Sequence, residues 1–509
     1  MYFNMAGLAQ VVLTLYDYWF TVLPSTLLVY FLFQRYRHGL NRIPGPVIRS
    51  ISPIPRIVSV LKGRSHEDDI RLHQKYGKIV RIAPNSFSIS DPAEINQLYG
   101  LGTKFLKSPF YELSEAQDEE GIIPDTFIIN DKELHTRMKK NAANAYSMNG
   151  LVQMEPLVEP VTERLVKKLE EYAVNGNAVD IGDMIANYTM DAVFALTFAR
   201  DFDYMSHGDV LGIHRVMKVA SWYMAVFGQI AWTHKFLLAN PVVAGWVFGD
   251  GGQSQADMMA VANTEVQKGR NRVSEDGPMT FLQRLILNQR ANPKSINDRE
   301  VLAHAFGNIT AGSDTTATAI RGILYHLLKT PEAYQKLVEE IRSANLALPV
   351  GFAEANRIEY LGAVIKEGMR LHPSVGMMLG RTVPSEGAVI CGYKLPGGAE
   401  VGLNPWILHR NPAVFPNPDK FWPERWLSSV TSEEQLRLMN RSFLTFGHGA
   451  HTCSGRWIST METTKLLPTL LRYYDMELDD GGRTYRFENF WFTMQKGLKV
   501  RLRKRVDLL

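Results

Sequence analysis

The distribution of apolar and polar residues along the chain predicts long helices together with a few short strands. Apolar and polar positions alternate over Ile79–Ile82 and Phe87–Ser90, on either side of a Pro-Asn pair, which is typical of a β-hairpin. Val301–Leu328 is a much longer apolar stretch, and at about 1.5 Å per residue it predicts a helix roughly 40 Å long. Leu361–Leu371 has the spacing of a further helix.

Residues 1–34 have the composition of a membrane anchor. Met5–Phe33 is mostly apolar, and arginines follow it directly whereas no basic residue precedes it. Its uncharged part, Tyr18–Phe33, would span only about 24 Å of a hydrocarbon core about 30 Å thick, so we expect the helix to begin before Asp17. The arginines on its C-terminal side place the rest of the chain in the cytosol. A cleaved signal peptide is the alternative, although a basic leader and a small-residue cleavage site are missing.

Residues 35–46 form a basic and proline-rich hinge after the anchor. The segment ends in Ile-Pro-Gly-Pro, which is a stiff and non-helical connection. With 45% hydrophobic residues, the remaining 47–509 can bury a large core.

Charge and cysteine content exclude two classes of protein. The net charge is +4 and no basic run is interleaved with aromatic residues, so a nucleic-acid partner has no electrostatic support. The two cysteines, Cys391 and Cys453, form no C-x-x-C pair, which excludes a cysteine-rich zinc site and fits a reducing compartment. We expect Cys391 to be structural and to lie in a strand before Gly392.

Cys453 stands in a glycine-rich loop that leads into a helix. Backbone N–H groups of a tight loop and the positive end of a helix both favour a thiolate, which is a strong metal ligand. Taken alone, a small buried thiol at the start of a helix is the alternative interpretation.

The residues around this cysteine resemble a known ligand loop. Phe446, Gly449, Cys453 and Gly455 match F-x-x-G-x-x-x-C-x-G, the haem-ligand loop of the cytochrome P450 family, and the chain is most similar to its microsomal fungal branch of the pisatin demethylase type. In that family the cysteine sulfur is the proximal ligand of haem iron, so the resemblance implies thiolate-ligated haem as cofactor and Cys453 as the metal ligand. It also implies the fold, which is mainly α with small β-sheets in one large domain over 47–509, behind the N-terminal membrane anchor.

The long helix carries a second motif of the same family. Residues 311–316 read Ala-Gly-Ser-Asp-Thr-Thr and match A/G-G-x-D/E-T-T/S. Ala311, Asp314 and Thr315 lie at i, i+3 and i+4, so we expect them on one helix face. A carboxylate and a hydroxyl there suit proton delivery during oxygen activation, and the resemblance implies that Asp314 and Thr315 are the catalytic residues. The alternative is a helix whose polar side chains bond to its own backbone or face water.

Four further residues stand where the family binds the two propionate carboxylates of haem. His135 and Lys139 are four residues apart, at positions that are often Trp and Arg, and this spacing puts them on one helix face. Arg381 and His451 occupy two more such positions, and many members carry Arg in place of His451. The resemblance implies that these four residues bind haem, and a solvated basic helix face is the alternative for the first two.

A separate set of residues matches the scaffold motifs of the family. Glu367 and Arg370 form E-x-x-R, and Arg425 stands in the P-E-R motif further along the chain. A pair at i, i+3 is usually a modest surface ion pair. With Arg425 as a third member, the resemblance implies a network that holds the loop carrying Cys453.

The resemblance implies a membrane-anchored haem-thiolate monooxygenase that inserts one oxygen atom from O2 into a lipophilic small molecule. The reaction would be a hydroxylation, epoxidation or O-demethylation in fungal specialised-metabolite biosynthesis or detoxification. Electrons would come from a separate NADPH–cytochrome reductase, since no flavin or dinucleotide domain is evident. The protein would be single-pass in the endoplasmic reticulum membrane, in contact with membrane lipid, with a cytosolic catalytic domain.

Two other functions stay open at this point. A haem-thiolate isomerase or dehydratase would need no reductase, but it would also not need the proton relay that Asp314 and Thr315 suggest. A non-catalytic haem-binding membrane protein would act through partners instead of turnover. Substrate identity depends on how the pocket loops pack, which the motifs do not encode.

Overall fold

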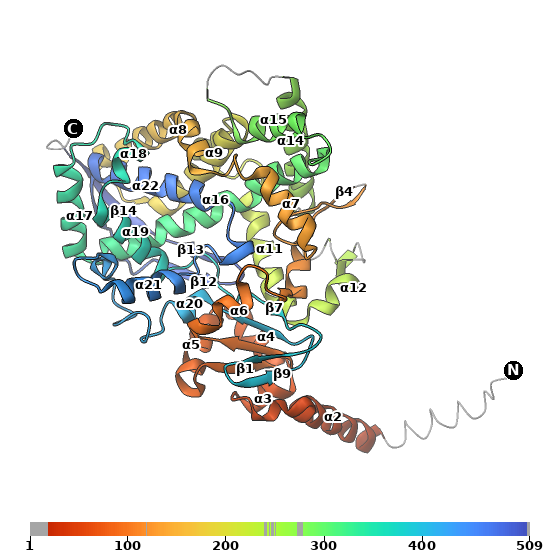
Figure 1. The fold of residues 1–509 in the computed structure, drawn as a ribbon. Coiled ribbons are helices and arrows are strands. Elements are labelled where there is room, and N and C mark those ends of the chain that lie inside the picture. The colour runs from red at the N-terminus through yellow and green to blue at the C-terminus, as the bar shows by residue number, and fades with distance from the viewer. Residues whose placement is uncertain are drawn as a thin grey trace.

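The computed structural model describes residues 19–118, 120–238, 242–243, 245, 249, 251–271 and 278–505. Helices dominate and the sheets are small, which confirms the expected fold class. The helices form one large body, and α2 projects from the end where the largest sheet lies (Figure 1).

The helices cover most of the chain, and their bounds show where each one begins and ends. In the first half they are α2 (Trp19–Tyr36), α3 (Val47–Ile51), α4 (Ile54–Leu61), α5 (Ser65–Tyr76), α6 (Ile95–Tyr99), α7 (Lys132–Ala142), α8 (Met148–Asn175), α9 (Ile181–Phe198), α10 (Tyr204–His207), α11 (Ile213–Phe227) and α12 (His234–Leu238). In the second half they are α14 (Gly251–Asn271), α15 (Phe281–Ala291), α16 (Asp298–Leu328), α17 (Pro331–Ser343), α18 (Phe352–Ala355), α19 (Glu359–Leu371), α20 (Pro405–Leu408), α21 (Glu433–Ser442) and α22 (Arg456–Tyr473).

Within the described residues, the strands form five small sheets. The largest has the order β1-β2-β10-β7-β3 and the next has the order β11-β14-β6, while β12-β13, β4-β5 and β8-β9 are two-stranded. The bounds are β1 (Ile79–Ala83), β2 (Ser86–Ile89), β3 (Leu106–Lys107), β4 (Gln117–Asp118), β5 (Gly121–Ile122), β6 (Val179–Asp180), β7 (Arg381–Thr382), β8 (Ala388–Ile390), β9 (Tyr393–Leu395), β10 (Glu400–Leu403), β11 (Tyr474–Leu478), β12 (Arg486–Asn489), β13 (Thr493–Lys496) and β14 (Lys499–Lys504).

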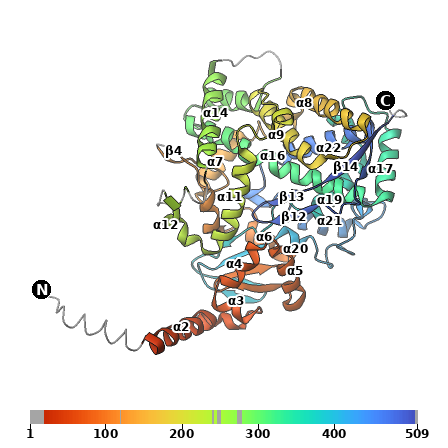
Figure 2. The same ribbon diagram turned by 180° about the vertical axis from the view of Figure 1, so that it is seen from behind.

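Helix α16 is the central element of the helical body (Figures 1 and 2). Its start is fixed by a capping box, in which the Asn297 side chain accepts from the Glu300 N–H and the Glu300 side chain accepts from the Asn297 N–H. Pro331 opens the next helix and cannot continue this one. Most of α16 is buried in the main hydrophobic core together with α9, α19 and α22, so it is a rigid element on which a site can be built.

The sequence predictions for local structure were mostly confirmed. Strands β1 and β2 form the expected antiparallel hairpin, and α16 and α19 cover the two predicted helices. The prediction that Cys391 lies in a strand was wrong, because this residue lies in the turn between β8 and β9. It adopts a positive φ of 47°, and the strand pairing that ends at Ile390 leaves it outside the ladder.

The N-terminal segments pack on the largest sheet. In the region predicted as a hinge, Leu40 and Ile43 are buried, and the Arg81 guanidinium of β1 donates to the carbonyls of Gln34 and Arg35. The predicted anchor begins within residues 1–18, which lie outside the described residues, and continues into α2. In the described part of the chain, no helix combines the length and the hydropathy needed to cross a membrane.

Candidate functional site

The loop that carries Cys453 is a tight structure fixed by its own backbone. Gly447 and Gly449 have φ of 72° and 62°, in the left-handed region that side chains disfavour. A Cβ on Gly449 would lie 2.0 Å from the Tyr99 carbonyl oxygen, so only glycine fits there. The Cys453 N–H donates to the Phe446 carbonyl at 2.8 Å and closes the loop just before α22 begins.

Cys453 is exposed although many protein atoms lie around its thiol. Burial raises its pKa, whereas the backbone N–H groups of Gly455 and Arg456 and the charge of Lys139 act in the opposite direction. A Cβ added to Gly455 would meet only the Cys453 sulfur, at 3.9 Å. The residue that leads into α22 therefore adds no side chain beside the sulfur.

Two residues of the predicted motif on α16 are accessible at the helix surface. Ala311 is exposed and Thr315 is partly exposed one turn further on. The Thr315 hydroxyl donates to the Ala311 carbonyl at 2.9 Å, which is the backbone bonding that the sequence left as an alternative. Thr315 therefore holds its proton within the helix and can release it only by rotating its side chain.

Asp314 points to a neighbouring helix and not along the Ala311–Thr315 face. Its carboxylate lies 2.7 Å from Nδ1 of His214 on α11, and both side chains are about one-fifth exposed. The Asp314 carboxylate therefore contacts α11, whereas the sequence predicted only a shared helix face with Ala311 and Thr315. Sequence reasoning missed His214, which no local motif marks.

Basic residues gather on one side of the Cys453 loop. His135 and His451 lie with their ring centroids 4.4 Å apart, and the charged neighbours of His451 are Lys107, Arg381, His135 and Lys139. Burial, followed by these charges, lowers the pKa of His135 to about 4 and that of His451 to about 2. The four residues expected to bind propionates therefore lie together, with two neutral histidines and with Lys139 and Arg381 as the positive charges.

Lys107 is a fifth member of this basic cluster and was missed in the sequence. It lies in β3 opposite Arg381 of β7, and its ammonium donates to the carbonyls of Thr126 and Ile129. Burial, followed by the charge of Arg381, lowers its pKa to about 7. Lys107 follows Phe-Leu and belongs to no recognisable motif. A charged residue at a buried strand position is unusual, however, and could have marked it as a candidate for the site.

Lys139 also contacts the Cys453 loop directly, which the sequence did not predict. Its ammonium donates to the Ala450 carbonyl at 3.0 Å and to the Thr452 carbonyl at 2.5 Å, so it ties α7 to the Cys453 loop. The charge of this lysine also favours the Cys453 thiolate.

The residues present fit haem. Its two carboxylates would neutralise the basic cluster, which is defined as Lys107, His135, Lys139, Arg381 and His451. Two buried nitrogens of this cluster, His451 Nδ1 and Arg381 Nε, have no hydrogen-bond partner in the protein, and such groups are costly unless a ligand satisfies them. The thiol of Cys453 would supply the iron ligand at the same place.

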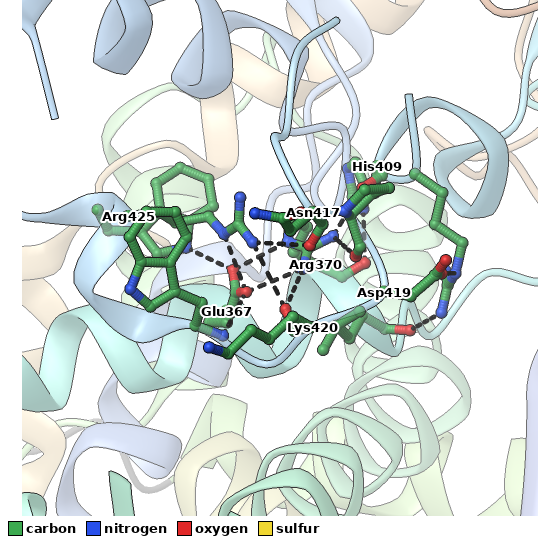
Figure 3. A network of polar contacts seen from close by, with 12 residues as sticks. Glu367, Arg370, His409, Asn417, Asp419, Lys420 and Arg425 are labelled. Atoms are coloured by element: carbon green, nitrogen blue, oxygen red, sulfur yellow. Dashed lines mark hydrogen bonds and ion pairs between the residues drawn. The ribbon is translucent and has the colours of Figure 1, made fainter. Parts of the chain in front are cut away.

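The predicted scaffold network is present and fully buried (Figure 3). Glu367 accepts from Arg370 at 2.8 and 2.9 Å and from the Arg425 Nε at 3.0 Å, and none of the three side chains is more than 1% exposed. Both arginines also donate to backbone carbonyls of the segment 416–420. Their charges outweigh the burial of Glu367 and lower its pKa, so this carboxylate is ionised.

An aromatic cluster contacts Arg381 of the site through the Tyr111 hydroxyl. The ring of Trp491 lies 4.9 Å from that of Phe110 and 5.8 Å from those of Tyr111 and Phe127. Buried apolar residues of α11 and Met377 belong to the same cluster. These side chains form an apolar wall suited to a lipophilic molecule.

Comparison with known proteins agrees with this geometry. The family model described as cytochrome P450 matches residues 48–501. The chain is 35% identical over 466 residues to a cytochrome P450 monooxygenase of Aspergillus terreus, covering 89% of this chain and 94% of that protein. It is 34% identical to the cytochrome P450 monooxygenase cicH of Emericella nidulans, with 93% and 95% covered, and 30% identical to pisatin demethylase of Fusarium vanettenii, with 92% of each covered. The matched residues include both the Cys453 loop and α16. This chain therefore belongs to the cytochrome P450 family of haem-thiolate oxidoreductases.

Proposed function

We propose that this protein is a membrane-anchored monooxygenase that inserts one oxygen atom from O2 into a lipophilic small molecule. The observation that carries the proposal is the basic cluster beside the accessible Cys453 thiol, because together they suit a dianionic, iron-bearing cofactor. Relatives named as monooxygenases and a demethylase support a hydroxylation, epoxidation or O-demethylation in specialised metabolism or detoxification.

Different residues of this chain have different roles in the proposed reaction. When bound, haem supplies the iron at which molecular oxygen is activated. Cys453 would hold the group through its sulfur, the basic cluster would bind its carboxylates, and the aromatic cluster around Trp491 would exclude water from the substrate. Thr315 would donate its hydroxyl proton after leaving the Ala311 carbonyl, and Asp314 would return a proton to Thr315 that it takes from the protonated imidazole of His214, which is itself reprotonated from water.

A separate reductase has a suitable surface on which to dock. Lys140 of α7, Arg441 at the end of α21 and Arg456 at the start of α22 are exposed and belong to the elements that surround the Cys453 loop. Such a surface favours encounter with an acidic electron-donating protein. We therefore propose an NADPH-dependent reductase as the partner.

Exposed apolar side chains support attachment to an endoplasmic reticulum membrane. Val47 and Ile48 of α3 and Ile54 of α4 are 57–64% exposed, and Trp232 and Phe236 are each 74% exposed. Apolar surface of this kind marks contact with lipid or protein. Together with the apolar N-terminal segment, these residues support a single-pass anchor in residues 1–34 and a catalytic domain, 47–509, in the cytosol.

Turnover with and without reductase tests the reaction class. We expect product only with reductase and NADPH, and we expect Thr315→Ala and Asp314→Asn to release more peroxide per NADPH while substrate binding stays nearly normal. Thr460→Ala is the matched control, because Thr460 is also a helical threonine bonded to its own backbone but lies on the surface. Product that forms without reductase and is untouched by both substitutions would instead support an isomerase.

Protease added to intact microsomes tests the orientation. A cytosolic haem domain should be digested, whereas a lumenal one would be protected. Full protection would overturn the proposed topology.

A further inference from the structure

His409 lies beside Arg370 of the scaffold network (Figure 3) and also bonds to Leu444, which precedes Cys453. It follows α20 directly and its side chain is fully buried. Arg370 donates to the His409 carbonyl at 2.8 Å, and the His409 ring nitrogen Nδ1 lies 3.2 Å from the Arg370 carbonyl. The two residues are therefore joined twice, once through each backbone carbonyl.

The other ring nitrogen reaches the Cys453 loop. The backbone N–H of Leu444 donates to His409 Nε2 at 2.9 Å, so this nitrogen carries no proton. Nδ1 must then carry the proton that it donates to Arg370, which fixes one tautomer. Burial, followed by the charge of Arg370, lowers the His409 pKa to about 3, so the ring stays neutral.

The hydrogen bonds continue from Leu444 toward the sulfur ligand. The Leu444 carbonyl accepts from Gly447 at 2.9 Å, and the Phe446 carbonyl accepts from Cys453 at 2.8 Å. The ring of Phe443 stacks on that of His409 with centroids 5.3 Å apart and planes 14° apart. The imidazole thus fixes the point where the chain enters the loop, both in position and in orientation.

We propose that His409 is a positioning residue that transmits the geometry of the Glu367–Arg370–Arg425 network to the Cys453 loop. The inference rests on the assignment of Cys453 as the iron ligand. Loss of the ring would leave the buried Leu444 N–H without an acceptor, while the hydrogen bonds inside the loop would remain. The fold should therefore persist while the entry to the loop becomes free to move and the sulfur leaves its position more easily.

Three substitutions separate the functions of the ring. His409→Gln can place an amide oxygen near Nε2 and keep the bond to Leu444, whereas His409→Asn reaches only the Nδ1 side and keeps the bond to Arg370. His409→Phe keeps the stacking on Phe443 and removes both bonds. His73→Gln is the matched control, because His73 is also buried with two hydrogen-bonded ring nitrogens but joins α5 to β2.

Two measurements on each variant test the proposal. Hydrogen–deuterium exchange of the peptide around Leu444 should be about tenfold faster in the Phe and Asn variants, the effect of losing one hydrogen bond of about 1.4 kcal/mol. The reduced carbon monoxide complex of these two variants should shift toward the form without a thiolate ligand. His409→Gln should resemble wild type in both measurements, and His73→Gln should leave both unchanged.

The outcomes distinguish this inference from the assignment of Cys453. A wild-type protein without the thiolate-type spectrum would contradict Cys453 as the ligand. The role of His409 would be overturned if the Asn and Gln variants both matched wild type in the thiolate-type spectrum and in slow exchange of the Leu444 amide. This test holds even if His409→Phe fails to fold.

Discussion

The imidazole of His214 and the carboxylate of Asp314 join α11 to α16, with Nδ1 and Oδ1 2.7 Å apart. Burial alone would lower the pKa of His214, but the hydrogen bond and charge of Asp314, together with Asp209, outweigh burial and the opposing charge of Arg321 and raise it. The group proposed to return protons to Thr315 is thus held by a histidine whose pKa is raised above its ordinary value.

This pair should make stability depend on pH in a defined direction. Because the pKa of His214 is raised by folding, the pair stabilises the protein fully below about pH 6.5 and less as the pH rises through the folded-state pKa. Wild type should lose about 0.5–1 kcal/mol relative to Asp314→Asn across that range, measured by urea unfolding. The exposed pair of Asp203 and His207 provides the control, and equal pH profiles for wild type and Asp314→Asn would contradict the expectation.

Glu367→Ala should destabilise the protein severely. The substitution leaves two buried guanidinium groups without their carboxylate, which costs on the order of 3–5 kcal/mol. Thermal unfolding and haem content measure the effect. Glu433→Ala removes an ion pair whose side chains are about 80% exposed, so it should change stability by less than about 0.5 kcal/mol. Similar losses for both variants would contradict a buried network.

Glu462→Gln should remove a pH-dependent loss of stability. Both carboxyl oxygens of Glu462 are buried without a hydrogen-bond partner, and burial raises its pKa from 4.5 to about 8. The folded state holds this proton, so wild type should lose about 1.4 kcal/mol per pH unit as the pH rises between these two values. Glu462→Gln should unfold with a flatter pH profile and be the more stable protein at alkaline pH. A profile parallel to that of wild type and of the exposed control Glu477→Gln would refute this.

Lys107→Met should weaken haem retention. The substitution keeps most of the length of the side chain but removes its ammonium from the basic cluster, and a hydrogen bond to a charged group contributes about 1.5–3 kcal/mol. Transfer of ferric haem to apomyoglobin should therefore be at least about tenfold faster. Lys104→Met is the control, because Lys104 is three residues away, 76% exposed and paired with Glu386. Transfer at the same rate from both variants would exclude Lys107 from the cofactor site.

Motifs with fixed spacing were readable from the sequence because their geometry is local. The β1–β2 hairpin, α16 and the Glu367–Arg370 pair depend on neighbours within one element, and all were confirmed. Only glycine fits at position 449 because the Tyr99 carbonyl lies so close. The loop motif was nevertheless sufficient to predict Gly449 as a site residue without knowledge of that contact.

Contacts between distant segments could not be read in the same way. Asp314 and His214 are 100 residues apart, and the direction of the carboxylate is decided by how α11 packs on α16. Lys107 meets Arg381 only because β3 pairs with β7, and the bond between His409 and Leu444 depends on how α20 lies against the loop. Each of these relationships arises from tertiary packing that leaves no periodic signal.

The place of β10 in the largest sheet has a consequence for biosynthesis. Strand β10 pairs in parallel with β2, and Ser86 and Glu400, which face each other there, are 314 residues apart. At about 5–20 residues per second, a ribosome needs roughly 15–60 s to deliver β10 after β2 has emerged. During that interval the β1–β2 hairpin presents an unpaired edge, which is a template for association with other chains. The nascent protein should therefore require a chaperone for this hairpin, and ribosome stalling before β10 should increase aggregation.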